Sequence, residues 1–102
     1  MEPLLLKDDE IINKLDLLNK DSKNAWRVTG NVLSKEFLFD DFNLAFRFMT
    51  LCAAEAELMN HHPQWCNNYN SVLVNLTTHA KNGITHLDFE LAQIMDMLAL
   101  TV

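Results

Sequence analysis

The hydrophobic positions of this chain repeat with two different periods along its length. Apolar residues three or four positions apart predict helices, and apolar residues two positions apart predict strands. The first such segment follows helical spacing, with apolar positions at Ile11, Leu15 and Leu18. Asp8 or Asp9 stands where an acidic N-cap would begin it. The pattern therefore predicts a short helix, preceded by an apolar N-terminal arm.

A hairpin is predicted after a polar loop at residues 19–24. Segments 25–29 and 32–39 flank Gly30-Asn31, a pair suited to the positive φ angles of a two-residue turn. The second of these strands has an apolar face formed by Leu33, Phe37 and Phe39, and Lys35 is the exception on it.

A helix of about five turns is expected next, from Phe42 to Asn60, with its cap at Asp40-Asp41. Its apolar residues form two stripes rather than one. The first stripe contains Phe42, Ala45, Phe46, Met49, Ala53 and Ala56. The second contains Leu44, Phe48, Leu51 and Leu58. Because a surface helix needs only one apolar stripe, we expect the second to form the interface of a homo-oligomer.

The rest of the chain predicts a second pair of strands and a last helix. The strands are expected at 64–67 and 71–79, the second ending at His79. Thr85 and Asp88 have the spacing of a capping box before the last helix. That helix is expected to bury Leu87, Leu91, Ile94, Met95 and Leu98. The order helix, two strands, helix, two strands, helix predicts a two-layer α+β domain spanning residues 1–102, with three helices on one face of a four-stranded antiparallel sheet.

Composition and charge narrow the range of functions. The formal net charge is -6 and the basic residues are scattered, which argues against direct binding of nucleic acid. No apolar run approaches the length that spans a bilayer, and the N-terminal segment lacks the basic start of a secretory signal. Two cysteines without scaffold spacing fit a reducing compartment, so we expect a cytoplasmic protein.

Candidate chemistry gathers between Glu57 and Asp88. Glu57 lies one helical turn before His61, so we expect its carboxylate beside that imidazole. Pro63 disfavours helix at His62, so the helix must end near His61. Each histidine alone fits a helix-end or strand-end residue, and Asp88 alone fits a capping residue. A metal site is disfavoured, because adjacent histidines do not easily converge on one ion.

Together these residues resemble the signature of the pterin-4a-carbinolamine dehydratases. The signature comprises Glu-x-x-x-His-His-Pro from Glu57 to Pro63, then Tyr69, His79 and Asp88. Segment 37–50 also resembles that family's strand-to-helix junction, and the likeness extends from Trp26 onward.

The resemblance implies a lyase that converts 4a-hydroxytetrahydrobiopterin to quinonoid dihydropterin and water, recycling the cofactor of aromatic amino-acid hydroxylases. It implies that His61 and His79 form the acid/base pair and that His62 binds and orients the pterin. Histidine suits proton transfer because its unperturbed pKa lies near neutrality. The resemblance further implies that Glu57 and Asp88 orient imidazoles. The ring would lie near Pro63 and Trp65, and backbone at Thr77 and Thr78 would bind its amide edge. No metal or organic cofactor is implied.

The resemblance also implies a second, non-enzymatic role. Animal members of the family bind the dimerisation helix of a homeodomain transcription factor, which would make this chain a transcriptional coactivator, nuclear as well as cytoplasmic. The second apolar stripe of the long helix is the surface expected to bind that partner helix. The same resemblance implies dimers joined through sheet edges and tetramers joined through helices.

Overall fold

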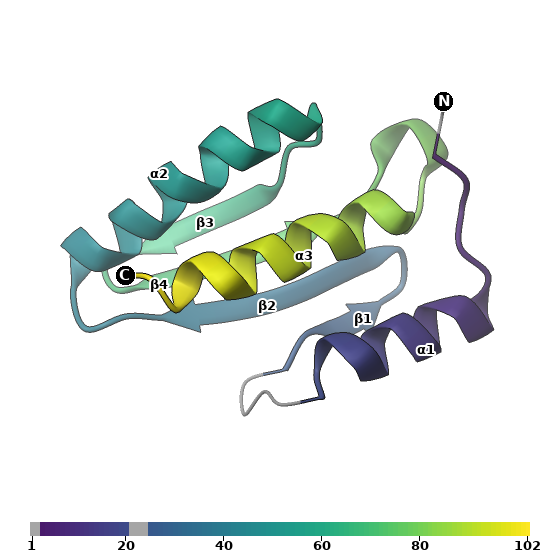
Figure 1. Cartoon of the computed structure of the whole chain (residues 1–102), viewed down its shortest axis with the longest axis horizontal. Helices are drawn as coiled ribbons and strands as arrows, with labels where there is room; N and C mark the ends of the chain where they lie inside the picture. The colour runs from purple at the N-terminus through teal and green to yellow at the C-terminus, as the bar shows by residue number, and fades with distance from the viewer. Residues whose placement is uncertain (1–2, 21–24) are drawn as a thin grey trace.

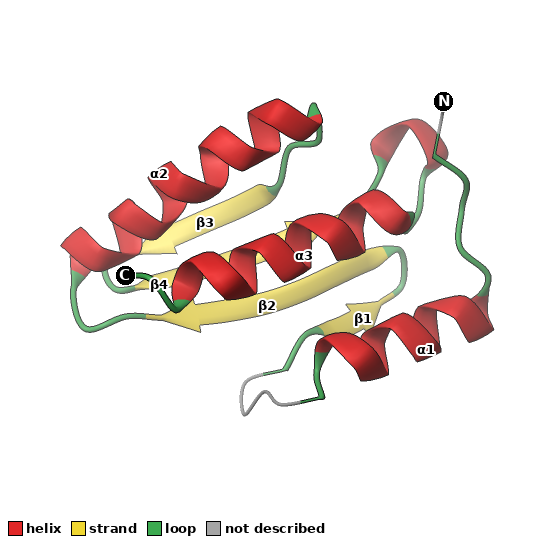
Figure 2. Cartoon of the chain, viewed as in Figure 1, coloured by secondary structure: helices red, strands yellow, loops and turns green. Residues whose placement is uncertain are grey.

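A four-stranded antiparallel sheet carries three helices on one face in the computed structural model, which describes residues 3–20 and 25–102 (Figure 1). Residues 21–24 of the predicted polar loop lie outside the described residues. The elements follow in the order α1 (Asp8–Leu18), β1 (Arg27–Thr29), β2 (Val32–Leu38), α2 (Phe42–Met59), β3 (Gln64–Asn68), β4 (Ser71–Leu76), the 3-10 helix η1 (His79–Lys81) and α3 (His86–Ala99). The predicted fold class and order of helices and strands are confirmed (Figure 2).

The strands are arranged in the order β1-β2-β4-β3, so the two central strands come from different hairpins. Leu33 on β2 lies opposite Leu76 on β4, and Val74 on β4 lies opposite Trp65 on β3. Because side chains alternate along a strand, these residues share the face that the helices cover. The fully buried core joins that face to α2 and α3 through Leu33, Val72, Val74, Leu76, Ala45, Phe48, Leu91 and Met95.

The face of α2 that packs against the core combines residues from both predicted stripes. Its buried residues are Ala45, Phe48, Cys52 and Ala56, which follow helical spacing but belong to neither predicted stripe alone. Phe48 is 0% exposed and contacts Phe37 and Phe39, with ring centroids 4.6 and 5.0 Å away. The prediction that Phe48 belongs to an oligomer interface is therefore wrong. The large apolar side chains that α2 leaves exposed are Phe42, Phe46 and Leu58.

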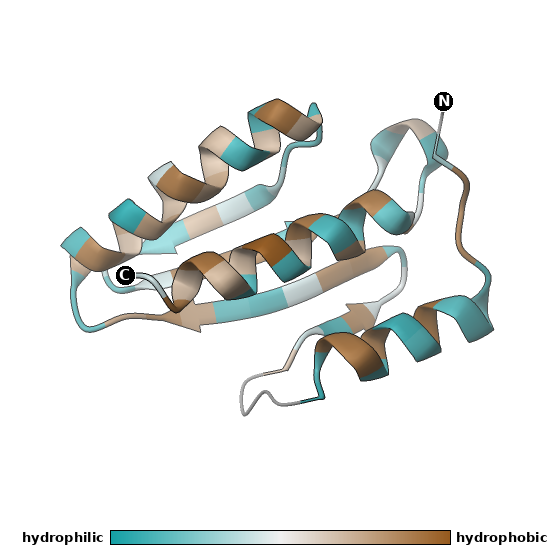
Figure 3. Cartoon of the chain, viewed as in Figure 1, coloured by the Kyte–Doolittle hydropathy of each residue, from teal (hydrophilic) through white to brown (hydrophobic). Residues whose placement is uncertain are grey.

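Lys35, the predicted exception on the apolar face of β2, is buried and paired. Figure 3 shows the hydrophilic stretch in the middle of β2, between two apolar ends. Lys35 Nζ donates to Asp96 Oδ1 on α3 at 2.8 Å. The indole Nε1 of Trp26 donates to the same carboxylate at 3.0 and 3.1 Å, and Lys35 Nζ lies 4.7 Å from the ring centroid of Phe37. A buried ammonium is tolerated here because a carboxylate and aromatic rings surround it.

Several element ends differ from those the sequence predicts. Helix α1 is capped at Lys7, whose backbone N–H donates to the side chain of Glu10, and Asp8 and Asp9 lie inside its first turn. Gly30 has a φ of 59°, and no positive φ occurs at Asn31. Over the described part of the chain, no helix is both long enough and apolar enough to cross a membrane.

Candidate active site

The exit of α2 sets the directions of the two adjacent histidines. Asn60 is in the left-handed region with a φ of 51°, which ends the helix one residue earlier than expected. The backbone N–H of His61 then donates to the carbonyl of Ala56 at 3.0 Å. His62 and Pro63 continue without helical structure, as expected for a residue that precedes proline. The backbone therefore separates the two imidazoles instead of stacking them on one helix face.

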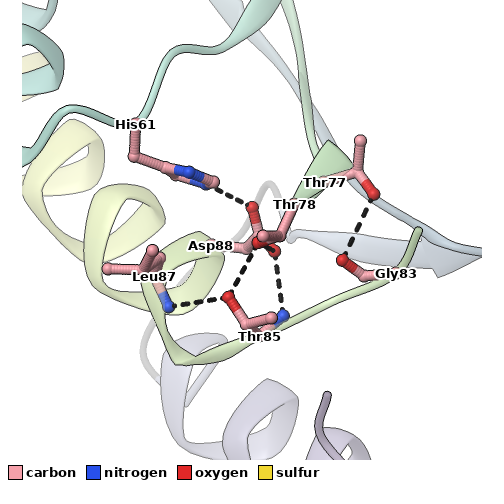
Figure 4. Close-up of polar contacts among 7 residues, drawn as sticks. All are labelled: His61, Thr77, Thr78, Gly83, Thr85, Leu87 and Asp88. Atoms are coloured by element: carbon pink, nitrogen blue, oxygen red, sulfur yellow. Dashed lines mark hydrogen bonds and ion pairs between the residues drawn. The ribbon is translucent and has the colours of Figure 1, made fainter. Parts of the chain in front are cut away.

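His61 points inward and pairs with the buried carboxylate of Asp88 (Figure 4). His61 Nε2 lies 2.6 Å from Asp88 Oδ1, and the two residues are 7% and 0% exposed. The two residues come from different elements, because His61 follows the exit of α2 and Asp88 lies in the first turn of α3. A polar pair this deeply buried is worth more than a surface pair and orients its imidazole firmly.

The second oxygen of Asp88 caps α3. Asp88 Oδ2 accepts from the backbone N–H of Thr85 at 2.9 Å and from Thr78 Oγ1 at 2.9 Å. The hydroxyl of Thr85 in turn accepts from the backbone N–H of Leu87 at 3.3 Å. The predicted capping box is confirmed. Asp88 is thus both a capping residue and the partner of a histidine.

Counting protons in this network shows that His61 faces Asp88 with a donor nitrogen. Thr78 has one hydroxyl proton and donates it to Asp88, so the 2.7 Å contact between Thr78 Oγ1 and Thr85 Oγ1 must use the proton of Thr85. Every partner of Oδ2 is therefore a donor, as a carboxylate requires. His61 Nε2 donates to Oδ1 for the same reason, so in the neutral form of this imidazole Nδ1 is the nitrogen without a proton.

His62 has a weaker partner at the surface. Its Nε2 lies 3.0 Å from Glu57 Oε1, and the two side chains are 60% and 80% exposed. Ion pairs this exposed contribute about 0–1 kcal/mol. The prediction that Glu57 lies beside His61 is wrong, because the left-handed Asn60 turns His61 away from the α2 surface and brings His62 to Glu57.

His79 lies in a short loop rather than on β4. The strand ends at Leu76, and His79 is the exposed first residue of η1. The loop is closed at its base, where Thr78 N–H donates to the carbonyl of Gly83 at 2.9 Å and Gly83 N–H donates back at 3.4 Å. The predicted strand 71–79 is therefore three residues too long, because the backbone at Thr78 pairs with Gly83 and not with a neighbouring strand.

One carboxylate connects the segments that carry the histidines. Asp88 binds His61 with one oxygen and Thr78, the neighbour of His79, with the other. The ladder between β3 and β4 ends at Gln64 opposite Asn75, two residues after His62 and two residues before Thr77. The His-His-Pro segment and the η1 loop therefore lie at the same end of the sheet.

The remaining predicted site residues border this end. Trp65 is half-buried and packs against the core, and Thr77 Oγ1 donates to the carbonyl of Gly83 at 3.4 Å. Both backbone groups of Thr78 are used within the loop, since its carbonyl accepts from the N–H groups of Lys81 and Gly83. The prediction that backbone of Thr78 binds substrate is thus disfavoured, and its hydroxyl supports Asp88 instead.

Sequence reasoning missed the way Thr78 and Thr85 complete the site. The capping-box spacing predicts that Thr85 meets Asp88, but nothing in the sequence indicates that the hydroxyl of Thr78 contacts both Thr85 and the same carboxylate. Among residues 3–20 and 25–102, no three His, Cys, Asp or Glu side chains are grouped to hold a metal ion.

Residues 5–98 match the protein family described as Pterin 4 alpha carbinolamine dehydratase. This chain belongs to that family. A dehydratase relative from Solibacter usitatus, named "Putative pterin-4-alpha-carbinolamine dehydratase", is 51% identical over 77 residues, which are 76% of this chain and 81% of that protein. A relative of the same name from Sulfurisphaera tokodaii is 49% identical over 81 residues, which are 79% of this chain and 85% of that one.

Solved structures of two dehydratase-like proteins share this fold. The crystal structure of a "transcriptional coactivator/pterin dehydratase" from Brucella Melitensis has 38% sequence identity and a TM-score of 0.86, covering 94% of this chain and 99% of that one. A pterin dehydratase-like protein described as a RuBisCO assembly factor in the alpha-carboxysome has 21% identity and a TM-score of 0.63, covering 78% of this chain and 92% of that one. At that identity the second likeness shows the fold alone.

Proposed function

We propose that this member of the family is a lyase acting on 4a-hydroxytetrahydrobiopterin. The C4a–O bond breaks, the N5–H bond breaks and a double bond forms between C4a and N5, giving quinonoid dihydropterin and water. The departing hydroxyl needs a proton and N5 must lose one, so the reaction needs an acid and a base and no net oxidant. The product is the pterin form that reduction would return to aromatic amino-acid hydroxylases.

The observation that best supports this proposal is the carboxylate bridge of Asp88. It holds His61 with one oxygen and the residue before His79 with the other, at 2.6 and 2.9 Å. Two histidine-bearing segments that lie apart in the sequence are thus tied to one rigid helix start. Acid/base catalysis depends on this kind of fixed placement of proton carriers.

Each side chain takes a role that its environment supports. His61, oriented by Asp88 with Nδ1 unprotonated, is suited to proton transfer, and the exposed His79 is its acid/base partner. His62 binds and orients the pterin, with Glu57 holding its Nε2. The planar side chain of Trp65, beside Pro63, borders the ring, and the backbone near Thr77 binds the amide edge.

A direct assay tests the proposal by following quinonoid dihydropterin formation from freshly generated carbinolamine. His61→Ala and His62→Ala should each lower the rate by on the order of a hundredfold or more. The matched control for His62→Ala is His86→Ala, because His86 is likewise exposed and paired with a glutamate, with its Nδ1 3.3 Å from Glu90 Oε1, but stands on α3. A chelator should leave the wild-type rate unchanged. Wild-type rates in both site variants, or loss of activity with the chelator, would refute the assignment.

A helix-binding coactivator is the second candidate function, and the exposed apolar side chains of α2 favour it. Phe42 and Phe46 are about half exposed and stack one turn apart, with ring centroids 5.6 Å apart, and Leu58 is 82% exposed. Leu44 and Leu51 are half-buried beside them. Monomeric proteins seldom leave such surface open, so we propose self-association through α2, as a dimer or tetramer, or capture of a partner's amphipathic helix.

The two uses of α2 can be tested separately from the enzyme activity. Phe46→Glu should convert the oligomer to a monomer in sedimentation at micromolar concentration and abolish capture of a homeodomain dimerisation helix. His61→Ala should leave both measurements unchanged. A wild-type protein that sediments as a monomer and captures no such helix contradicts this candidate. The protein is placed in the cytoplasm under the first proposal and also in the nucleus under the second.

A further inference from the structure

The N-terminal arm lies against the loop that carries His79. In Figure 1 the purple N-terminal segment runs beside the green loop that precedes α3. The backbone N–H of Leu6 donates to the carbonyl of Ile84 at 3.0 Å. Leu5 forms an antiparallel bridge with Thr85. The arm therefore adds a short strand-like contact to the outer side of the loop, some eighty residues away in sequence.

The fit between arm and loop is close at Gly83. This glycine is buried, and a Cβ built on it would lie 2.6 Å from Leu5 Cδ2. Real Cβ atoms do not approach another carbon so closely, so a side chain at position 83 must displace Leu5. Gly83 thus leaves the space that the end of the Leu5 side chain occupies against the loop.

The residues that the arm contacts are those that hold the site. Thr85, opposite Leu5, gives its backbone N–H to Asp88, and Gly83 closes the base of the loop with Thr78. The loop is consequently held from two sides, by the Asp88 network within and by the arm outside. Between these supports lies η1 with the exposed His79.

We propose that Leu5 and Leu6 are positioning residues for the dehydration, acting through the loop 78–85 on the placement of His79. This inference rests on the proposed function and extends it to residues that lie outside the histidine signature. The contacts of Leu5 and Leu6 given above are with the loop that carries His79, so their loss should change the catalytic step more than pterin binding. A displacement of about 1 Å in a catalytic group can slow a reaction by up to a hundredfold.

The first test compares proline substitutions in the arm of the full-length protein. Leu6→Pro removes the N–H that donates to Ile84, and Leu4→Pro makes the same change at a residue that is 75% exposed. We expect Leu6→Pro to lower kcat about tenfold with KM within twofold, and to speed amide hydrogen exchange at Thr78, Asn82 and Gly83. Leu4→Pro should match the wild type in both. Leu6→Val, which keeps the donor, should retain wild-type kcat.

A second test uses the close contact between Leu5 and Gly83. Gly83→Ala should lower kcat by displacing the Leu5 side chain from the loop, and adding Leu5→Ala should bring kcat to the value of Leu5→Ala alone, because the shortened side chain leaves room for the new methyl group. Circular dichroism must show both variants folded at the assay temperature.

The inference is overturned if Leu6→Pro speeds exchange in the loop and leaves kcat unchanged, or if neither quantity moves. It is also overturned if kcat falls only in proportion to the unfolded fraction. A wild-type protein without dehydratase activity would instead contradict the proposed function, while the exchange rates would still report whether the arm holds the loop.

Discussion

Replacing Asp88 by asparagine separates its charge from its shape. Asparagine fills the same volume and offers one oxygen and one amide nitrogen. Thr85 N–H and Thr78 Oγ1–H both donate at this position, so the oxygen must face them. The amide nitrogen then faces His61 Nε2 and, being a donor, forces that nitrogen to accept. The proton of a neutral imidazole moves to Nδ1, which removes the free nitrogen proposed as the base.

The structure allows the size of both effects to be worked out. Asp88 Oδ1 and Oδ2 accept three hydrogen bonds, each of which loses its ionic character but keeps a partner, and the helix N-terminus loses a negative charge. At about 0.5–1 kcal/mol for each bond and up to 1 kcal/mol for the helix dipole, the loss of stability is about 1.5–4 kcal/mol. Typical domains have about 5–15 kcal/mol, so the variant should remain folded. Loss of an acid/base group should lower kcat by about 10²–10⁴.

The assay combines dehydration kinetics with chemical unfolding. Asp41→Asn is the matched control, because Asp41 caps α2 by accepting from Leu44 N–H at 2.9 Å and contacts no histidine. That variant should lose about 1 kcal/mol or less and keep wild-type kcat. Wild-type kcat in Asp88→Asn would refute the tautomer argument. An equal fall in kcat in both variants would show that the effect is general loss of stability.

Three further predictions address other parts of the chain. His79→Ala should lower kcat by about a hundredfold or more with a change in unfolding free energy of about 0.5 kcal/mol or less, since the side chain is exposed; a normal rate would remove His79 from the acid/base pair. Lys35→Met should lower the free energy of unfolding in urea by about 2–4 kcal/mol and leave the dehydration rate unchanged, because it leaves the carboxylate of Asp96 without its cation. Unchanged stability would show that solvent screens the pair. Burial raises the pKa of the Cys52 thiol from 9.0 to about 12, and Glu55 adds to the rise, so the folded state keeps a proton that the unfolded state loses above about pH 9. Stability should therefore fall between about pH 9 and 12 more steeply in the wild type than in Cys52→Ala, and parallel curves would contradict this.

The order of elements was predictable because each has a local signal. Helical and strand periods, the Gly30 turn and the Thr85–Asp88 capping box all act over a few residues and agree with the final packing. The core face of α2 was not predictable, because apolar residues surround most of that helix and only the position of the sheet decides that Phe48 points inward. Lys35 shows the same limit, since its partner Asp96 is 61 residues away.

The candidate site was predictable as a set of residues but not as a set of pairs. The histidines and both carboxylates stand out by type and spacing. Which carboxylate holds which imidazole depends on the left-handed Asn60, which no apolar pattern indicates. From the sequence, Asp88 fits either a capping residue or a functional residue, and in the structure the same carboxylate caps α3 and binds His61.

Under the proposed function, that double use of Asp88 couples catalysis to the folding of one helix terminus. Because Oδ2 is fixed by the first turn of α3, Oδ1 can hold His61 only while that turn is formed. This first turn of α3 is anchored by three residues that follow Asp88 and are buried in the core, Phe89, Leu91 and Ala92. The start of α3 cannot fray without releasing the imidazole. The free energy of local unfolding of this turn should therefore equal the free energy that governs the loss of activity. A site built this way obtains its rigidity from the core and needs no separate scaffold.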